Sequence, residues 1–291
     1  MGKISVIIPT LNAEKELPEL FRSLKSQTQT ADEIIIVDSE SEDKTVEICK
    51  QNNAKLIQIR RKEFDHGKTR DMALRESTGD IVVFLTQDAI PANKIFLSKL
   101  ISYLNEDKVA VSTGRQLPKE NATRMEQLIR AYNYPSESYI RSKDDLSKMG
   151  IKTFFCSDVC AAYNRNIYIE LGGFDYPLKT NEDMFFAAKV INSGYRIAYA
   201  ADAQVFHSHN FTLSEQYRRN YIQGYEIENH KERLNNVSQE TEGMRLVKYV
   251  SRELLKKGHL LSFAHFGLDC MARYLGSKNG KRKYKKGEFN E

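Results

Sequence analysis

The chain has 291 residues, of which 41% are hydrophobic and 29% are charged, and its formal net charge is +5. This composition is that of an ordinary globular protein and excludes collagen-like and fully disordered classes. No apolar stretch approaches the length of a membrane span, and the chain enters a predicted strand almost at once instead of a signal peptide. We therefore expect a cytoplasmic protein.

The first half of the chain alternates predicted strands with predicted helices. Apolar runs predict strands at 4–8, 33–37, 55–59, 81–85 and 109–112. Apolar residues at helical spacing lie between them, for example Leu17, Leu20 and Leu24. The run IVVFL at 81–85 is apolar throughout, as expected for a strand that is buried on both faces of a parallel sheet. The alternation predicts an α/β fold with a doubly wound, mostly parallel sheet and flanking helices.

The second half is less regular. We expect one helix within 114–135, a strand over 154–165, extended structure over 195–206 and a long polar helix over 213–234. Another helix is predicted from Asn181, as its capping residue, to Gly194. The four cysteines, Cys49, Cys156, Cys160 and Cys270, form no metal-binding pattern and are predicted to be thiols.

Basic residues are concentrated near the end of the chain. Between Arg245 and Glu291 there are 12 Lys and Arg and 4 Asp and Glu, so the preceding part is net acidic. We divide the chain into a main domain, 1–235, and a helical, basic extension, 236–291. Mixed apolar and basic residues suit an anionic membrane surface. The alternatives are an oligomer-forming helix and a solvated terminus; nucleic acid is disfavoured because no known binding module accompanies the basic patch.

Polar segments follow several of the predicted strands: PTLN at 9–12, DSES at 38–41, TQDA at 86–89 and HSHN at 207–210. In open α/β sheets ligands bind at the carboxyl ends of the strands, so these segments predict a shared cleft with Asp88 at its mouth. We expect a cation and a phosphate to bind there. Each residue alone has another interpretation: Asp38 as a turn residue or cap, and Glu182 and Asp183 as acids that complement a helix dipole.

The ordered motifs resemble those of the family 2 glycosyltransferases, which are inverting enzymes with the GT-A fold. They are VIIPTLN, EIIIVDSESEDKT, TRDMALRESTGDIVVFLTQDA, LGGFD and NEDMFFAAKVINSGYRIAY, and they span about residues 4–210. Within this family, EFDHGKTR, TQDAIP, GRQLP and VFHSHN resemble the bacterial rhamnosyltransferase branch.

The resemblance implies roles for particular residues. The implied donor-binding residues are Pro9, Thr10, Asn12, Asp38, Ser39, His66, Lys68, Arg70, Gln87 and Asp88. Asp88 is the implied ligand of a divalent cation, Mn²⁺ or Mg²⁺, together with His207 or His209. Asp183, with Glu182 beside it, matches the catalytic base. Arg115, Gln116 and Asp158 are assigned to the acceptor side, although a structural hydrogen bond explains Asp158 equally well.

The sequence departs from the family pattern at three positions. Thr86 and Gln87 stand where a further carboxylate is common, so protein ligation of the metal rests on Asp88 and histidine. Ser39 replaces the second acid that usually recognises the nucleoside.

The segment around Gly67 has two interpretations. In the first, His66, Lys68 and Arg70 contact the diphosphate or sugar hydroxyls. In the second, Gly67 only permits a turn, and Lys68 and Arg70 are solvated.

The implied reaction is a single displacement in which Asp183 takes the proton of the acceptor hydroxyl. At a helix start, Asp183 is expected to have a lowered pKa. In the rhamnosyltransferase branch the donor would be dTDP-β-L-rhamnose and the acceptor a polyprenyl-diphosphate-linked saccharide of a cell-surface polysaccharide. The enzyme would then sit at the inner face of the plasma membrane. The alternatives are a family 2 transferase with a UDP-sugar donor and a non-catalytic sugar-nucleotide-binding protein.

Overall fold

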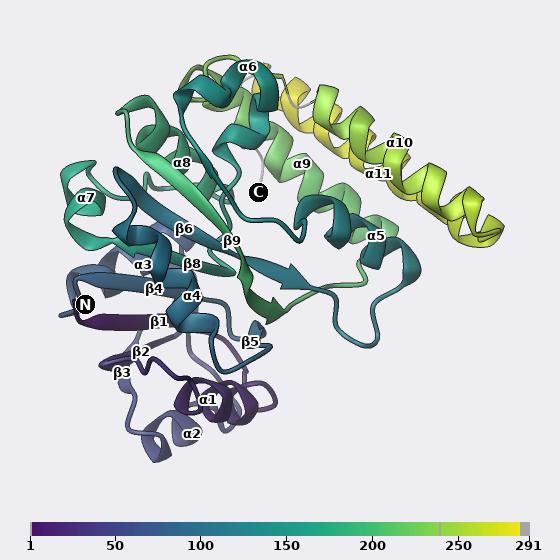
Figure 1. Ribbon diagram of the computed structural model, residues 1–291. Coiled ribbons are helices and arrows are strands. Elements are labelled where there is room, and N and C mark those ends of the chain that lie inside the picture. The colour runs from purple at the N-terminus through teal and green to yellow at the C-terminus, as the bar shows by residue number, and fades with distance from the viewer. Residues whose placement is uncertain (1, 239, 286–291) are drawn as a thin grey trace.

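The computed structural model describes residues 2–238 and 240–285 (Figure 1), so residues 286–291 of the predicted basic extension lie outside the described part. The strands are β1 (Ile4–Thr10), β2 (Glu33–Asp38), β3 (Lys55–Gln58), β4 (Ile81–Leu85), β5 (Ile90–Pro91), β6 (Val109–Leu117), β7 (Tyr139–Arg141), β8 (Cys160–Asn164) and β9 (Arg196–Phe206). The helices are α1 (Leu17–Lys25), α2 (Thr45–Gln51), α3 (His66–Arg75), α4 (Phe96–Ser102), α5 (Arg124–Asn133), α6 (Leu146–Met149), α7 (Arg165–Glu170), α8 (Glu182–Asn192), α9 (Leu213–Asn229), α10 (Glu240–Lys256) and α11 (Leu260–Lys285).

The strands form a single sheet in the order β3-β2-β1-β4-β8-β6-β9-β5, and β7 also pairs with β9. Strands β1 to β4 are parallel to one another, and β6 is parallel to β9. The predicted mostly parallel α/β sheet is therefore confirmed. Strand β8 is antiparallel to both of its neighbours, β4 and β6. Because it is antiparallel, β8 begins at the edge of the sheet where β4 ends.

The predicted strand at 154–165 is too long. Residues Gly150–Phe154 form a 3₁₀ helix, and strand pairing begins only at Cys160. The intervening polar residues lie at the edge of the sheet, beside the end of β4. The long polar helix is also shorter than expected, because α9 ends at Asn229 and a 3₁₀ turn, Lys231–Leu234, follows it.

Both faces of the central sheet are covered, which explains the continuous apolar runs in the sequence. Ile7 and Phe84 face the layer that contains α3, α7 and α8, and Phe84 packs against Tyr163 there. Val6 and Ile8 face the opposite layer, which α1 and α4 cover. Since successive side chains of a strand point to opposite faces, nearly every position of such a strand is apolar; Ser5 of β1 is buried as well and donates its hydroxyl to Glu33.

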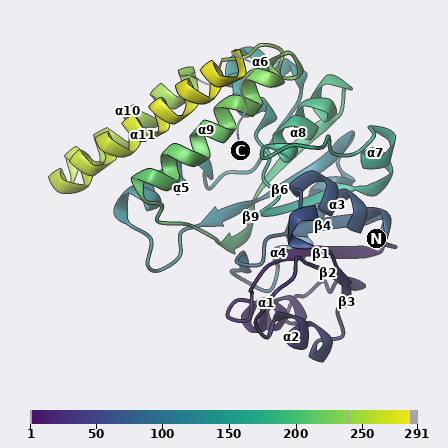
Figure 2. The same ribbon diagram turned by 180° about the vertical axis from the view of Figure 1, so that it is seen from behind.

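Helices α10 and α11 form an antiparallel hairpin along one side of the molecule, next to α5 and α9 (Figures 1 and 2). Val250, Leu254 and Phe266 of this hairpin pack against α5 in a small separate core. Helix α11 lies unusually close to α9, since a Cβ atom added at Gly280 would clash with the carbonyl oxygen of Tyr221. Within residues 2–238 and 240–285, no helix has the length and hydropathy required to cross a membrane.

Candidate active site

The loops that follow β1, β2 and β4 are joined by side-chain hydrogen bonds. The Gln87 amide oxygen accepts from the Leu11 N–H at 2.9 Å, and its amide nitrogen donates to the Leu11 carbonyl at 3.2 Å. Asn12, with φ +50°, donates its N–H to Ser41 Oγ at 2.8 Å, and its side-chain oxygen accepts from the Glu42 N–H. The predicted convergence of these strand ends is confirmed.

A cavity lies between these loops. Its lining residues are Pro9, Thr10, Leu11, Ser39, Arg61, Phe64 and Gln87. Four of them were predicted to bind the donor, whereas Leu11, Arg61 and Phe64 were missed, although Leu11 lies within PTLN and Phe64 within EFDHGKTR. Asp38 does not line the cavity. It is fully buried behind it and accepts hydrogen bonds from Thr10 Oγ1 at 3.3 Å and the Ser41 N–H at 3.1 Å.

Three residues from two strand ends form a cluster with the character of a metal site. Asp88 follows β4, and His207 and His209 follow β9. The Asp88 carboxylate lies 3.5 Å from His207 Nε2 and 3.3 Å from His209 Nε2, and the two nitrogens are 3.1 Å apart. Lys119 Nζ lies 3.4 Å from the same carboxylate. The sequence reasoning missed Lys119, since nothing in the pattern around it indicates that it reaches the end of β4.

Gln116 determines how His207 is oriented. Its amide oxygen lies 2.9 Å from His207 Nδ1 and also accepts from the Arg130 guanidinium, while its amide nitrogen donates to Ser157 Oγ at 2.9 Å. Because an amide oxygen only accepts, His207 Nδ1 carries the hydrogen and Nε2 presents its lone pair to Asp88 and His209. Burial lowers the pKa of His207 to about 3, so the imidazole is neutral at pH 7.

The ligand atoms of Asp88, His207 and His209 fit a divalent cation. Burial acts to raise the pKa of Asp88, but His207, Lys119 and His209 together lower it, so the carboxylate is ionised. An ionised carboxylate and neutral imidazole nitrogens are the forms that bind metal ions. Their ligand atoms lie within 4.8 Å of one another. Two facing imidazole nitrogens at 3.1 Å also require a cation or a hydrogen between them, because their lone pairs repel.

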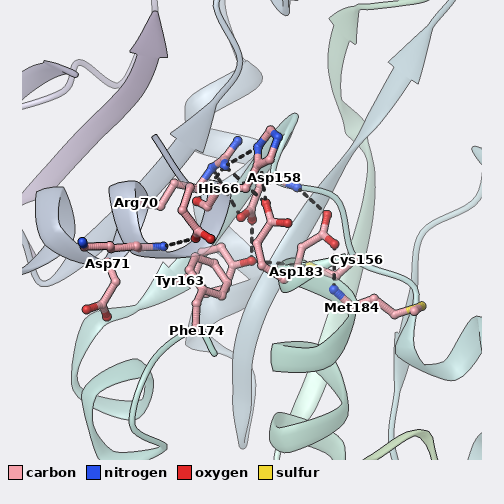
Figure 3. A network of polar contacts seen from close by, with 12 residues as sticks. His66, Arg70, Asp71, Cys156, Asp158, Tyr163, Phe174, Asp183 and Met184 are labelled. Carbon is pink, nitrogen blue, oxygen red and sulfur yellow. Dashed lines mark hydrogen bonds and ion pairs between the residues drawn. The ribbon is translucent and has the colours of Figure 1, made fainter. Parts of the chain in front are cut away.

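A second cluster contains three acids and one arginine (Figure 3); Arg70, Asp158 and Glu182 are buried, whereas Asp183 is only partly buried. Arg70 from α3 donates to Glu182 Oε1 at 3.2 Å, and its Nε lies 3.5 Å from Asp158 Oδ2. Asp183 accepts from the Asp158 N–H at 3.3 Å and the Met184 N–H at 2.7 Å. The guanidinium therefore contacts two of the three carboxyl groups, and Asp183 is bound by backbone N–H groups instead.

The expectation that Asp183 has a lowered pKa is wrong. Its pKa is raised well above the usual value, mainly by burial and then by the negative charges of Glu182 and Asp158. The two backbone N–H donors and the helix start act in the opposite direction but are outweighed. Burial also raises the pKa of Asp158 to about 7, although Arg70 opposes the shift. The cluster therefore holds a proton readily near neutral pH.

The two clusters lie at the same edge of the sheet and are linked. Ser157, which binds Gln116, immediately precedes Asp158, whose N–H donates to Asp183. Strand β8 begins directly after this segment, at Cys160. An antiparallel strand was needed to bring residues that precede it to the carboxyl ends of the parallel strands.

Other predicted residues occupy different environments. Asn181 occupies the N-cap position of α8 as predicted, but in a left-handed conformation, φ +66°, and its side chain makes no capping hydrogen bond. His66 is half-exposed, and its Nδ1 lies 4.0 Å from Glu182 Oε1. Lys68 is exposed, and Asp65 caps its backbone N–H. Arg115 donates to the Tyr134 carbonyl at 3.2 Å.

Comparison with known families identifies the class of this fold and site. A family model described as Glycosyl transferase family 2 matches residues 5–172. The chain belongs to this family and is a glycosyltransferase.

Two relatives indicate which kind of glycosyltransferase this chain is. The chain is 42% identical over 224 residues to the O-antigen chain rhamnosyltransferase RfbN of Salmonella typhimurium, which covers 76% of this chain and 71% of RfbN. It is 39% identical over 284 residues to the O-antigen chain rhamnosyltransferase WbaN of Salmonella anatum, which covers 97% of this chain and 90% of WbaN. The protein is a glycosyltransferase of the rhamnosyltransferase type.

Solved structures confirm the expected GT-A fold. The mannosyltransferase PcManGT from Pyrobaculum calidifontis, solved in complex with GDP-Man and Mn²⁺, has a TM-score of 0.66 and 16% identity, covering 99% of this chain and 88% of that chain. S. aureus TarS 1-349 has a TM-score of 0.58 and 21% identity, and the match covers 99% of this chain and 93% of that chain.

Proposed function

We propose that this enzyme transfers L-rhamnose from dTDP-β-L-rhamnose to a hydroxyl group of a polyprenyl-diphosphate-linked saccharide, with inversion at the anomeric carbon. The observation that carries the proposal is the link between the two clusters. Asp88, His207 and His209 are joined through Gln116 and the 157–158 segment to the partly buried acid Asp183. A charge-neutralising site and a base are the two parts that a single displacement requires.

The donor would lie between the cavity and the cation site. Pro9, Thr10, Ser39 and Gln87 line the cavity that would receive the nucleoside, next to the polar strand ends. Asp88, His207 and His209 would hold the cation, and the two imidazoles favour Mn²⁺ over Mg²⁺, which prefers oxygen ligands. When bound, a divalent cation neutralises negative charge on the departing diphosphate. The Mn²⁺ in the PcManGT complex supports this proposal.

Asp183 would act as the base. Its raised pKa makes it a stronger proton acceptor than an ordinary aspartate, and an efficient general base has a pKa near the working pH. Glu182 is bound to Arg70, and the negative charge of its carboxylate would raise the proton affinity of Asp183. Asp183 takes the acceptor proton as the acceptor oxygen bonds to the anomeric carbon and the dTDP oxygen leaves. One displacement without a covalent intermediate inverts the configuration.

The acceptor would be a saccharide of O-antigen type, as the names of RfbN and WbaN suggest. We propose in addition that it is lipid-linked and is met at the inner face of the plasma membrane. Asp158 and Arg115 lie at the acceptor side of Asp183 in this proposal. The structure gives Gln116 a further role, since it orients His207.

Release of nucleoside diphosphate tests the proposal. The purified enzyme is assayed with dTDP-L-rhamnose and a panel of UDP-sugars, with Mn²⁺ and with EDTA, in the presence of a membrane lipid extract as acceptor source. We expect release from dTDP-L-rhamnose only, and its loss with EDTA and in Asp88→Asn. Asp107→Asn, an exposed carboxylate elsewhere, is the control. Release from a UDP-sugar alone would contradict the rhamnosyl donor.

A further inference from the structure

The exposed apolar side chains of this protein are concentrated in the α10–α11 hairpin. Of the 17 large hydrophobic residues that are exposed in the described part of the chain, 11 lie between residues 240 and 285. The most exposed is Leu261, at 90%, and Leu260 beside it is 66% exposed. Leu255, at the end of α10, is 48% exposed. An apolar surface of this kind in a folded protein indicates a binding partner.

The turn of the hairpin presents these leucines at the end of the molecule. Helix α10 ends at Lys256 and is followed by Gly258, whose φ of +71° suits glycine, and the His259 N–H donates to the Leu254 carbonyl at 2.9 Å. Leu254 is fully buried in the core with α5, so it anchors the helix just before the turn. In both views the turn projects beyond α5, away from the sheet (Figures 1 and 2).

The apolar surface continues along α11. Leu261, Leu268 and Leu275 repeat every seven residues, and Met271 lies between the last two. All four are exposed. The opposite side of α11 carries the glycines that pack against α9. The helix therefore has one face that is buried in the protein and one apolar face without a cover in the described residues.

Charge distinguishes between the partners that this face could bind. Residues 240–285, which form the hairpin, contain 11 Lys and Arg and 4 Asp and Glu. One of these acids, Asp269, is bound to Arg273 at 2.6 Å. Lys256 and Lys257 lie at the turn itself, next to Leu255 and before Leu260. A second copy of the chain would bring the same positive charge, whereas an anionic bilayer would complement it.

We propose that the α10–α11 hairpin is a membrane anchor, whose turn inserts Leu255, Leu260 and Leu261 into an anionic lipid bilayer. Lys256 and Lys257 contact the anionic headgroups beside the inserted leucines, and the outer face of α11 lies in the interface. The inference rests on the proposed function in one respect only: a lipid-linked acceptor is reached at a membrane surface. It assigns the contact to a defined turn within the 236–291 extension.

Tryptophan fluorescence gives a direct test, because the chain contains no tryptophan. Leu261→Trp places a single fluorophore at the turn, and Ile169→Trp in α7, at a position that is 40% exposed, is the matched control. Each variant is mixed with vesicles of phosphatidylglycerol and phosphatidylcholine in equal parts, and with phosphatidylcholine vesicles. We expect Leu261→Trp emission to shift to shorter wavelength and to be quenched by brominated lipid only with the anionic vesicles. The Ile169→Trp emission should not change.

A second variant measures how much Leu260 and Leu261 contribute to vesicle binding. Leu260→Ser/Leu261→Ser should bind anionic vesicles about tenfold more weakly or worse in co-sedimentation, whereas Ile169→Ser should bind as the unaltered protein does. An unshifted Leu261→Trp emission with anionic vesicles would overturn the proposal. A blue shift that depends on protein concentration without vesicles would also overturn it, because a second copy would then cover the turn. Vesicle binding needs no donor or turnover, so its failure is distinguishable from failure of the proposed transfer reaction.

Discussion

Replacement of Gln116 by leucine tests the link between the protein core and the cation site. The side chain is 2% exposed, and its amide oxygen is the acceptor for both His207 Nδ1 and the Arg130 guanidinium. Leucine has a similar volume but no acceptor, so the buried N–H groups of His207 and Arg130 lose their partner. His207 is then free to rotate or to exchange tautomers, and Nε2 no longer faces Asp88.

The expected magnitude follows from these contacts. Loss of an outer hydrogen bond to a ligating histidine typically weakens metal binding about 10–100-fold. The unpaired buried donors cost a further ~1–3 kcal/mol of unfolding free energy. Mn²⁺ affinity is measured by calorimetric titration, and urea unfolding separates a weakened site from a lost fold. The control is Gln204→Leu, whose amide donates to the Ala201 carbonyl on β9.

Unchanged Mn²⁺ affinity in a folded Gln116→Leu protein would refute the reasoning. It would mean either that His207 is held by its packing alone or that it is no metal ligand. His207→Ala distinguishes these outcomes, since it removes the nitrogen itself.

Three further predictions concern stability. Arg70→Leu leaves buried carboxyl groups without their cation, so urea unfolding should show a loss of about 3–5 kcal/mol, whereas Arg60→Leu, in an exposed ion pair, should change little; equal effects would contradict the buried cluster. Asp158 has a pKa of about 7 in the folded protein and a lower pKa in the unfolded chain. Its contribution to the free energy of unfolding is therefore complete at low pH and is lost as the pH rises through 7. Asp158→Asn should therefore flatten the decline in unfolding free energy between about pH 4 and pH 7, and an unaltered slope would exclude this group as its cause. Gly280→Ala should force α11 from α9 at a cost of about 1–3 kcal/mol, whereas Gly267→Ala, in open space on the same helix, should stabilise by about 0.5–1 kcal/mol; the reverse order in thermal unfolding would contradict the close packing.

The meeting of the strand ends could be predicted from the sequence. A parallel sheet places all carboxyl ends at one edge, so Asp88 and the two histidines had to come close once the strands were recognised. The apolar run at 81–85 was sufficient for this, because its length and composition require burial on both faces.

The partners within the site could not be predicted. Gln116 reaches His207 because β6 pairs in parallel with β9, with a bulge between Gly114 and Arg115, and sequence alone does not give such a register. The predicted direction of the Asp183 pKa shift was wrong for a related reason. The position of Asp183 at a helix start and the charge of Glu182 beside it are local features, whereas the burial that dominates and the charge of Asp158 depend on how distant segments pack.

The central claim is that Asp183 is the base of a metal-assisted displacement, and Asp183→Asn tests it most directly. Asparagine keeps the size of the side chain but cannot accept the proton. We predict Mn²⁺ and donor affinities equal to those of the unaltered enzyme, with turnover to acceptor reduced about 10²-fold or more. Turnover at the normal rate, measured on the same preparation with the same affinities, would contradict the account.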